Sequence, residues 1–241
     1  KKLIDNGTDV NIKNEIGQTP LFIASQSGSK EIIELLINAG ANISAKDNQG
    51  QTPLFIASQS GSKEIIELFI SKGADINDKD NEGKNPLFIA SRQGNKEIIE
   101  LLISKGADVN AKDNSNNTVL FSPSGQGNKE IVELFISKGT DINTKNKYNY
   151  TALMSAFEEE NTDVVELLVK NGADVNVKNE NGKTLLIYAI ENDNKELIEL
   201  LLKNGASINY KDEIGRTPLI YASQRGKKEI VVPGRHGGCC A

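Results

Sequence analysis

Few residues in this chain have a type and spacing that could support catalysis or bind a cofactor. The only histidine, His236, lies near the C-terminus, so the body of the chain has no histidine for acid–base catalysis or metal binding. The two cysteines, Cys239 and Cys240, are adjacent in the last three residues, where they cannot form a disulfide framework. We therefore expect no active site, no bound metal and no cofactor.

Two short segments imitate ligand-binding motifs. Gly182-Lys183-Thr184 resembles the end of a phosphate-binding loop, but the first glycine of such a loop would fall at Val177. The segment from Asp78 to Gly83 resembles the start of a calcium loop, but its twelfth position would be Ile89, which cannot coordinate calcium. We expect neither segment to bind a ligand.

Acidic residues and glycosylation sequons are the remaining candidates for chemistry. Glu158, Glu159 and Glu160 could bind a cation, but a solvated acidic face is the favoured interpretation. Asn-x-Ser/Thr sequons matter only in a secreted chain and begin at Asn6, Asn42, Asn116 and Asn149. No set of residues resembles an active site, so we expect the protein not to be an enzyme.

Composition and charge narrow the class of protein further. Apolar residues make up 37% and charged residues 25% of the chain, which is typical of a folded protein. The net charge of −5 gives no basic surface for nucleic acid or anionic lipid. No apolar run approaches the roughly 18 residues of a membrane span. The cysteine-free body suits a reducing compartment, so we expect a cytoplasmic protein.

A seven-residue phrase recurs at a fixed interval of 33 residues and organises the whole chain. It begins at Thr19 and returns, without insertion or deletion, from Thr52, Asn85, Thr118, Thr151, Thr184 and Thr217. Such a period indicates stacked units that cannot bury their apolar faces alone. We predict an all-α solenoid of about seven helix-turn-helix units over residues 1–232, each with a β-turn finger, followed by a non-repeat tail over 233–241.

One unit illustrates the local structure that the sequence predicts. Thr52-Pro53 is a helix start, with a threonine cap and a proline at the first helical position, and Gly61 ends that helix. Ser62 is expected to cap a second, amphipathic helix, which Gly73 ends. The stretch from Ala74 to Gly83 reads as a β-turn finger that leads to the next cap.

This unit resembles the ankyrin repeat in its length, its Thr-Pro-Leu helix start and its Gly-Ala-Asp-Val/Ile-Asn segment, as in Gly73–Asn77 and Gly106–Asn110. One departure is systematic, because the family usually has histidine after Thr-Pro-Leu. This chain has an apolar residue there instead, at Phe22, Phe55, Phe88, Phe121, Met154, Ile187 and Ile220. We expect apolar packing to replace the polar link that the resemblance implies for histidine.

The pattern breaks at both ends and once in the middle. Lys1–Gly7 aligns with Glu34–Gly40, so we expect a further repeat upstream, and the last repeat is cut short before Pro233. Pro123 stands about five residues into a first helix, at a cost of about 3 kcal/mol if that helix stays regular. We predict that the array divides there into two blocks that can open separately.

The resemblance implies where a partner would bind, because partners of the family usually contact the finger tips and the exposed side of the first helices. In an early unit these positions carry the plain polar residues Asn48, Gln49, Gln51, Gln59 and Ser60. The unit that begins near Thr151 differs, since its finger carries two of the five tyrosines of the chain. Tyrosine is a common interface anchor, because it buries a rigid ring and keeps a polar tip.

The predicted partner-binding residues are Tyr148, Tyr150, Glu158, Glu159, Lys147, Lys183 and Arg92. The tyrosines form the centre, the glutamates recruit a basic group of the partner, and the last two residues lie on flanking units. The alternative is that both tyrosines pack locally and cover a finger left loose by Asn146 and Asn149.

The sequence therefore predicts a monomeric, non-catalytic module that presents a concave surface of fingers and first helices to a protein partner. Two alternatives remain open. The near-identical second helices also suit a spacer without a specific ligand, and the chain could be a regulatory arm of a larger enzyme or channel.

Overall fold

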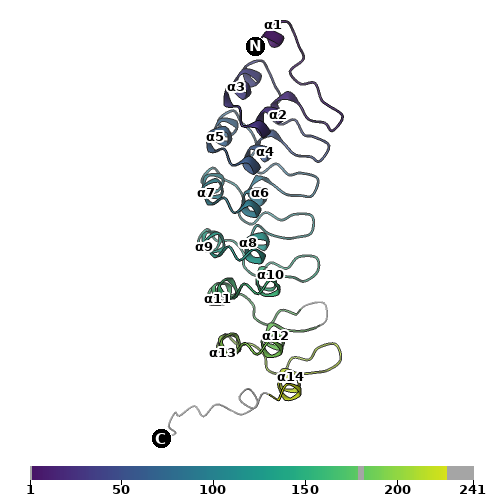
Figure 1. Cartoon of the computed structure of the whole chain (residues 1–241), viewed down its shortest axis with the longest axis vertical. Coiled ribbons are helices and arrows are strands. Elements are labelled where there is room, and N and C mark those ends of the chain that lie inside the picture. The colour runs from purple at the N-terminus through teal and green to yellow at the C-terminus, as the bar shows by residue number, and fades with distance from the viewer. Residues whose placement is uncertain (1, 179–181, 227–241) are drawn as a thin grey trace. The chain divides into compact units, whose positions relative to one another are not determined.

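A computed structural model describes residues 2–178 and 182–226 (Figure 1). Within these residues the chain forms fourteen helices and no strand, which confirms the predicted all-α repeat solenoid. The chain divides into two compact units. Unit 1 comprises Lys1–Pro123 and Glu130–Asp141, and unit 2 comprises Ser124–Lys129 and Ile142–Ala241.

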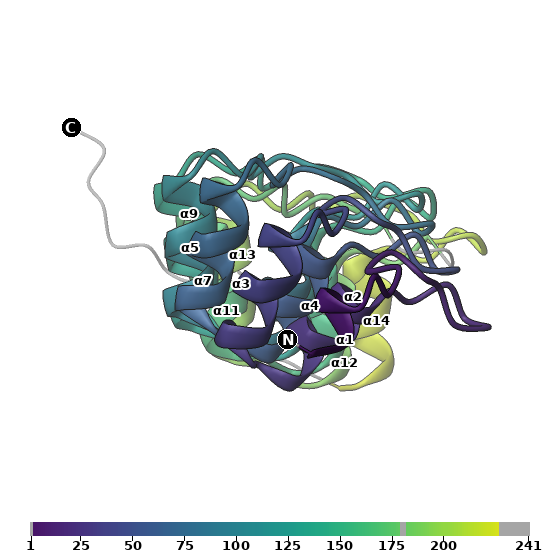
Figure 2. The ribbon, with the colours of Figure 1, turned by 90° about the horizontal axis from the view of Figure 1, so that it is seen from above.

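Unit 1 repeats a pair of short helices. Its first helices are α2 (Pro20–Ser27), α4 (Pro53–Ser60) and α6 (Pro86–Gln93), its second helices are α3 (Lys30–Asn38), α5 (Lys63–Ser71) and α7 (Lys96–Ser104), and α1 (Lys2–Asp5) precedes them. The first helices stack on one another, and α5 packs on α7. Within this unit the first helices lie between the second helices and the projecting loops (Figures 1 and 2).

Unit 2 has the same arrangement. Its first helices are α10 (Ala152–Glu158), α12 (Leu185–Glu191) and α14 (Pro218–Gln224), and its second helices are α11 (Thr162–Lys170) and α13 (Lys195–Lys203). Helix α12 packs against α13 and α14, and α11 packs against both α10 and α13. The short helix α8 (Phe121–Gly125) and helix α9 (Lys129–Ser137) are divided between the two units.

The first helices begin and end as the sequence predicts. The Thr52 hydroxyl accepts a hydrogen bond from the Phe55 N–H at 3.2 Å, and Pro53 follows at the first helical position. Gly61 ends the helix with a φ of 77°, in the left-handed region. The second helices are only partly as predicted, because Ser62 precedes α5 but its side chain makes no capping hydrogen bond.

The apolar residues that replace the family histidine are buried in most repeats. Phe22 and Phe55 are each only 2% exposed and belong to one cluster with Ile56 and Ile89. Met154 and Ile187 are also buried, whereas Ile220 on α14 is 41% exposed. Side-chain packing along the first helices thus takes the place of a polar link in unit 1.

Each finger that the structure describes in full is closed by one aspartate or asparagine side chain. In the finger before α4, Asp47 Oδ1 accepts hydrogen bonds from the N–H groups of Gln49 and Gln51, both at 2.9 Å. Neighbouring fingers of unit 1 are then joined by asparagines, since Asn81 Nδ2 donates to the Asn48 carbonyl at 3.0 Å and Asn114 Nδ2 donates to the Asn81 carbonyl at 2.9 Å. These links fix the fingers in the 33-residue register.

Pro123 shortens its helix instead of kinking it. Helix α8 has five residues, compared with eight in α4, because it begins two residues later in the repeat, at Phe121, and ends one residue earlier, at Gly125. Pro123 therefore lies in the first turn, where its missing N–H has no intrahelical partner to lose. The condition for the cost of about 3 kcal/mol, a helix that stays regular through Pro123, is thus not met. The first boundary between the two units falls after Pro123, but Glu130–Asp141 belongs again to unit 1, so the division is not a single cut at the proline. The separate opening of two blocks stays a prediction.

Four non-glycine residues adopt the left-handed backbone of the glycines found at the same positions in other repeats. They are Asn116 and Asn149, with φ of 64° and 61°, and Glu160 and Asp193, each with a φ of 56°. The predicted cut-short second helix near Lys228, the tail from Pro233 and the residues His236, Cys239 and Cys240 lie outside the described residues. In the part of the chain that the structure covers, no helix has the length and apolar character needed to cross a membrane.

Candidate functional site

The finger before α10 is ordered by the same turn as the other fingers. Asn146 Oδ1 accepts hydrogen bonds from the N–H groups of Tyr148 and Tyr150, at 2.9 and 3.0 Å, and Asn149 adopts a left-handed φ of 61°. Asn146 therefore closes this finger and does not leave it loose, which removes one premise of the local-packing alternative. The turn holds Tyr148 at the tip, where 55% of it is exposed.

The two tyrosines of this finger have different surroundings. The Lys147 ammonium lies 5.1 Å from the centre of the Tyr148 ring, within the range of a cation–π contact. Tyr150 points back toward α10, where its hydroxyl donates a hydrogen bond to the Glu158 carboxylate. Tyr150 and Glu158 thus stabilise the repeat internally, while Tyr148 offers its ring to solvent.

The next repeat contains a similar contact between the finger and the end of the first helix. Lys183 Nζ lies 2.9 and 3.0 Å from the two carboxylate oxygens of Glu191 at the end of α12. The same ammonium lies 5.4 Å from the ring centre of Tyr188 and 5.6 Å from that of Tyr221. The predicted partner contact Lys183 is therefore already neutralised within its own repeat.

A third cluster, which the sequence analysis missed, joins the last finger to α14. The buried Asp212 carboxylate accepts hydrogen bonds from the Tyr221 hydroxyl at 2.7 Å and from Arg216 Nε at 2.8 Å. The Arg216 guanidinium also lies over the Tyr221 ring, at 4.5 Å from its centre. The repeat register could have indicated this cluster, because Arg216 and Tyr221 stand 33 residues after Lys183 and Tyr188 and thus pair a cation with an aromatic ring at the same two positions.

These contacts shift the pKa values of Asp212 and Tyr221. Burial alone would raise the pKa of the Asp212 carboxyl, but the hydrogen bonds from Tyr221 and Arg216 outweigh burial and lower that pKa below its usual value. Burial, together with the hydrogen bond to the Asp212 carboxylate, raises the pKa of Tyr221 to about 12. At neutral pH the pair is thus a carboxylate and a neutral phenol.

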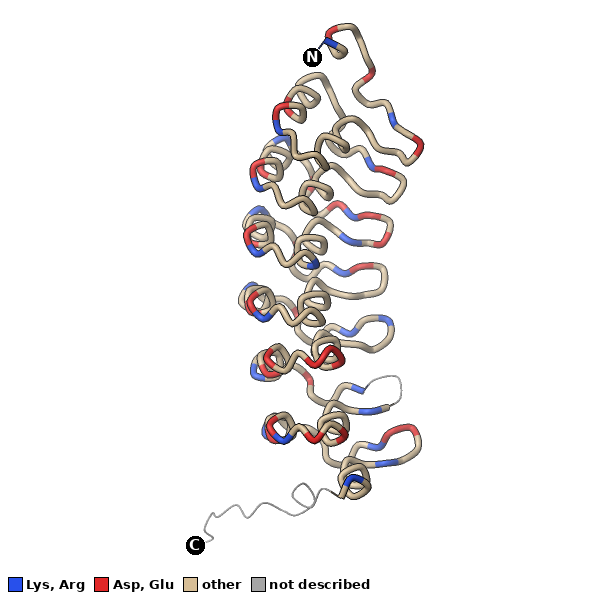
Figure 3. The backbone as a smooth tube through the Cα atoms, in the orientation of Figure 1, with Lys and Arg blue, Asp and Glu red and all other residues tan. Residues whose placement is uncertain are grey.

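The finger before α10 carries lysines, whereas the end of α10 is acidic (Figure 3). A hollow of about 790 Å³ beside Tyr148 is lined by three lysines and two acidic residues: Lys145, Lys147, Lys178, Asp174 and Glu213. The end of α10 instead carries the exposed acidic run Glu158–Glu160. The remaining predicted residue, Arg92, is exposed near the end of α6 and belongs to unit 1.

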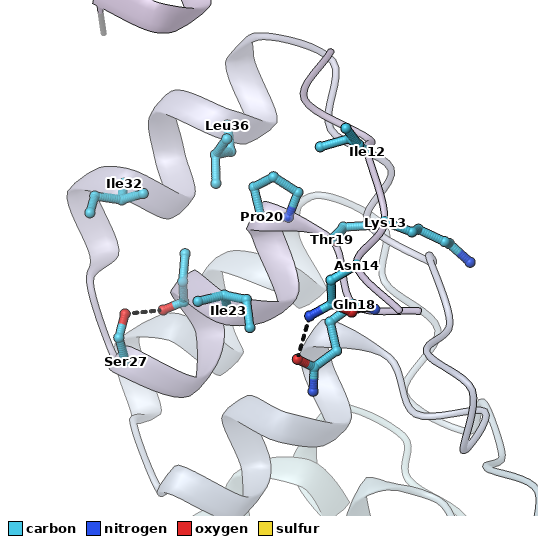
Figure 4. Close-up of a pocket in the computed structure, with 11 residues that line it drawn as sticks. Ile12, Lys13, Asn14, Gln18, Thr19, Pro20, Ile23, Ser27, Ile32 and Leu36 are labelled. Atoms are coloured by element: carbon cyan, nitrogen blue, oxygen red, sulfur yellow. Dashed lines mark hydrogen bonds between the residues drawn. The ribbon is translucent and has the colours of Figure 1, made fainter. Parts of the chain in front are cut away.

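An apolar hollow of about 530 Å³ lies beside α2 and α3 in unit 1 (Figure 4). Its wall includes Pro20, Ile23 and Ile32, of which Ile23 is 45% and Ile32 50% exposed. The equivalent Ile56 and Ile65 of the next repeat are buried, at 7% and 1% exposure. The hollow therefore has the composition of a surface on which repeats stack.

The two segments that imitate ligand-binding motifs have structural roles. Asp80 Oδ1 accepts hydrogen bonds from the N–H groups of Glu82 and Lys84, so the imitated calcium loop is a finger turn. Thr184 is the N-cap residue of α12, which explains the imitated phosphate loop. Among the described residues, no group of three or more His, Cys, Asp or Glu side chains is arranged to hold a metal ion.

Comparison with protein families agrees with this architecture. A family model described as ankyrin repeats in three copies matches residues 1–80, 87–179 and 153–232. A second model, described as ankyrin repeats in many copies, matches residues 60–103. A search of curated proteins gives no match to this chain.

Proposed function

Because the chain belongs to the ankyrin-repeat family, whose members are generally non-catalytic protein–protein interaction modules, we propose that it presents the fingers and first helices of unit 2 to a protein partner. The centre of this surface is Tyr148. Glu158 and Glu159 form its acidic side at the end of α10, and Lys147 forms its basic side on the finger.

The exposed ring of Tyr148 is the single observation that carries this proposal. Tyr148 is held at a finger tip because Asn146 Oδ1 accepts hydrogen bonds from the N–H groups of Tyr148 and Tyr150, which reduces the entropy that the finger would lose on binding. An aromatic side chain that is both exposed and fixed is a favourable interface anchor. The flanking Lys147 would also shield the ring from water when a partner covers it.

Glu159 is the acidic group that is best placed to contact a partner. It is exposed directly after α10, and its carboxylate has no hydrogen-bond or ion-pair partner among the described residues. Glu158, in contrast, is engaged by Tyr150. A lysine or arginine of the partner would therefore meet Glu159 more readily than Glu158, beside an apolar group that covers Tyr148.

The proposal can be tested by selecting a displayed random-peptide library on the full chain. Peptides that combine an apolar residue with a basic residue are expected to be enriched. Their affinity should fall at least tenfold for Tyr148→Ala, since an anchoring tyrosine contributes about 2 kcal/mol or more. Glu159→Gln should weaken only the peptides that carry the basic residue.

Ile214→Ala is the matched control, because Ile214 stands at the same position of the finger before α14 and is 73% exposed. This variant should leave the affinities unchanged. The proposal is wrong if selected peptides bind Tyr148→Ala as tightly as the wild-type chain, or if Ile214→Ala weakens them equally. Far-ultraviolet circular dichroism should give equal helicity for all variants.

A further inference from the structure

A second surface, chemically unlike the Tyr148 finger, lies on unit 1 between the fingers and first helices of the α2 and α4 repeats. It is a groove of about 290 Å³. Its apolar floor includes Phe22 and Ile56, which are 2% and 7% exposed, and Ile16 stands at its rim with 55% exposure. Its walls carry five glutamines: Gln18, Gln26, Gln49, Gln51 and Gln59. We call this surface the glutamine groove.

The side-chain amides of the glutamine groove are available to a ligand. Gln18 Oε1 accepts a hydrogen bond from Asn14 Nδ2 at 3.3 Å. The amides of the other four glutamines make no hydrogen bond to any residue that the structure describes. Each amide offers two donors and one acceptor oxygen, so the walls can pair with donors and acceptors alike.

The groove is almost free of charge. Helices α2 and α4 contain no charged residue, in contrast to the ends of α10 and α12 (Figure 3). The only charged side chain in the groove lining is Asp47, whose Oδ1 already accepts two N–H groups of its own finger. A charged ligand group would therefore lose water here without gaining an opposite charge, which is unfavourable.

The spacing of the glutamines matches an extended peptide. Gln18 and Gln26 face the groove from one repeat, and Gln51 and Gln59 occupy the same positions 33 residues later. Packed helices lie about 8–10 Å apart, and an extended chain advances about 3.3 Å per residue. Successive glutamine pairs can therefore reach backbone amides about three residues apart, with an apolar side chain against Ile16, the exposed apolar residue of the lining.

We propose that the glutamine groove binds an extended, uncharged segment of a partner protein, through the backbone amides of that segment and one apolar side chain. This inference shares with the proposed function only the general role in protein binding. It uses other residues in the other unit, so either proposal can fail without the other.

The repeat itself supplies a substitution that the fold tolerates. At the positions of Gln51 and Gln59 the next repeat carries Lys84 and Arg92. The double variant Q51K/Q59R therefore places known repeat residues in the groove and adds two positive charges. Asn38→Ser is the control, because the equivalent residues of α5 and α7 are Ser71 and Ser104 and the change lies outside the groove.

The probe is a displayed random heptapeptide library selected on the full chain, followed by synthesis of the enriched peptides. We expect a class of uncharged peptides with one apolar residue, whose Kd rises at least tenfold for Q51K/Q59R and stays unchanged for Asn38→Ser and Tyr148→Ala. N-methylation of the peptide backbone next to the apolar residue should also raise the Kd at least tenfold.

Three results would overturn this inference. They are the absence of an uncharged class among the enriched peptides, equal binding to Q51K/Q59R and the wild-type chain, and binding that is insensitive to backbone N-methylation. A different outcome is that the selection enriches only peptides whose affinity falls for Tyr148→Ala. In that case the inference that the glutamine groove binds a partner is wrong, and the proposed function stands. Equal helicity of the variants shows that loss of binding does not reflect unfolding.

Discussion

The glycine at three finger tips of unit 1, Gly17, Gly50 and Gly83, provides a sharp test of how the fingers are held. Gly83 has a φ of 80°, and a Cβ added there would lie 2.4 Å from Asn114 Oδ1 and 2.8 Å from the Asn114 backbone nitrogen. Gly73 has a similar φ of 90°, but an added Cβ would meet nothing within 4 Å. The pair Gly83→Ala and Gly73→Ala thus separates backbone strain from finger contact.

Backbone strain and lost finger contacts together determine the expected loss of stability of Gly83→Ala. A left-handed backbone costs a non-glycine residue about 1–2 kcal/mol, and both variants carry this cost. Gly83→Ala must also displace Asn114, whose backbone N–H donates to the Glu82 carbonyl at 2.8 Å and whose Nδ2 donates to the Asn81 carbonyl at 2.9 Å. Two lost hydrogen bonds add about 1–3 kcal/mol. We expect Gly83→Ala to cost about 2–5 kcal/mol in total.

Urea unfolding followed by circular dichroism measures both changes in stability, and hydrogen exchange measures the amide of Asn114 directly. Gly83→Ala should remove the protection of that amide, whereas Gly73→Ala should leave it intact. Equal destabilisation by the two variants, with the Asn114 amide still protected in both, would refute the view that the asparagine links hold the fingers in register.

Two further predictions concern stability. Asn77 links consecutive repeats, because its side chain donates to the Gly106 carbonyl at 3.2 Å and accepts from the Asp108 N–H at 2.9 Å. Ser44 replaces it one repeat earlier, so Ser44→Asn should stabilise unit 1 by about 1–2 kcal/mol in urea unfolding, and an unchanged midpoint would count against this link. The pKa of Tyr221 is about 12 in the folded chain and about 10 when unfolded. The stability that this proton contributes is therefore complete below pH 10 and is lost as the pH rises toward 12. Tyr221→Phe should lack this loss relative to the wild-type chain in unfolding measured from pH 8 to 12, and identical pH profiles would contradict the assignment.

Most of the fold could be predicted because the same signals for helix starts and helix ends recur in each repeat. The Thr-Pro start, the glycine end and the 33-residue interval place helices such as α4 to within a residue. The start of helix α8 could not be predicted in this way. A proline at position 123 can either kink the helix or make it begin later, and both are compatible with the repeat pattern. The choice is decided by packing around the proline, which no local pattern contains.

The candidate site was less predictable than the fold. Tyr148 could be recognised because two tyrosines on one finger are an unusual composition. The bond between Tyr150 and Glu158 and the cluster of Asp212, Arg216 and Tyr221 depend on which side chains reach one another, which the sequence alone does not give. The glutamine groove escaped notice for another reason, because each of its glutamines is unremarkable until the structure brings the five together over an apolar floor.

Two positions decide which polar groups a repeat offers to a partner. They are the residue after the glycine or asparagine of the finger turn and the residue eight positions later, near the end of the first helix. In the α10 and α12 repeats of unit 2 these residues bond to each other, as Tyr150 with Glu158 and Lys183 with Glu191, so a partner gains little from them. Contacts must then go to residues outside the pair, of which Tyr148 is the most exposed aromatic.

In the α2 and α4 repeats both positions are glutamine and neither pair is closed by a hydrogen bond in the described chain. Since open amides in a groove are satisfied either by water or by a ligand, a ligand that replaces this water must supply hydrogen bonds of its own. An extended backbone does so at every residue, which is why we propose a side-chain anchor for a partner in one unit and a backbone contact in the other.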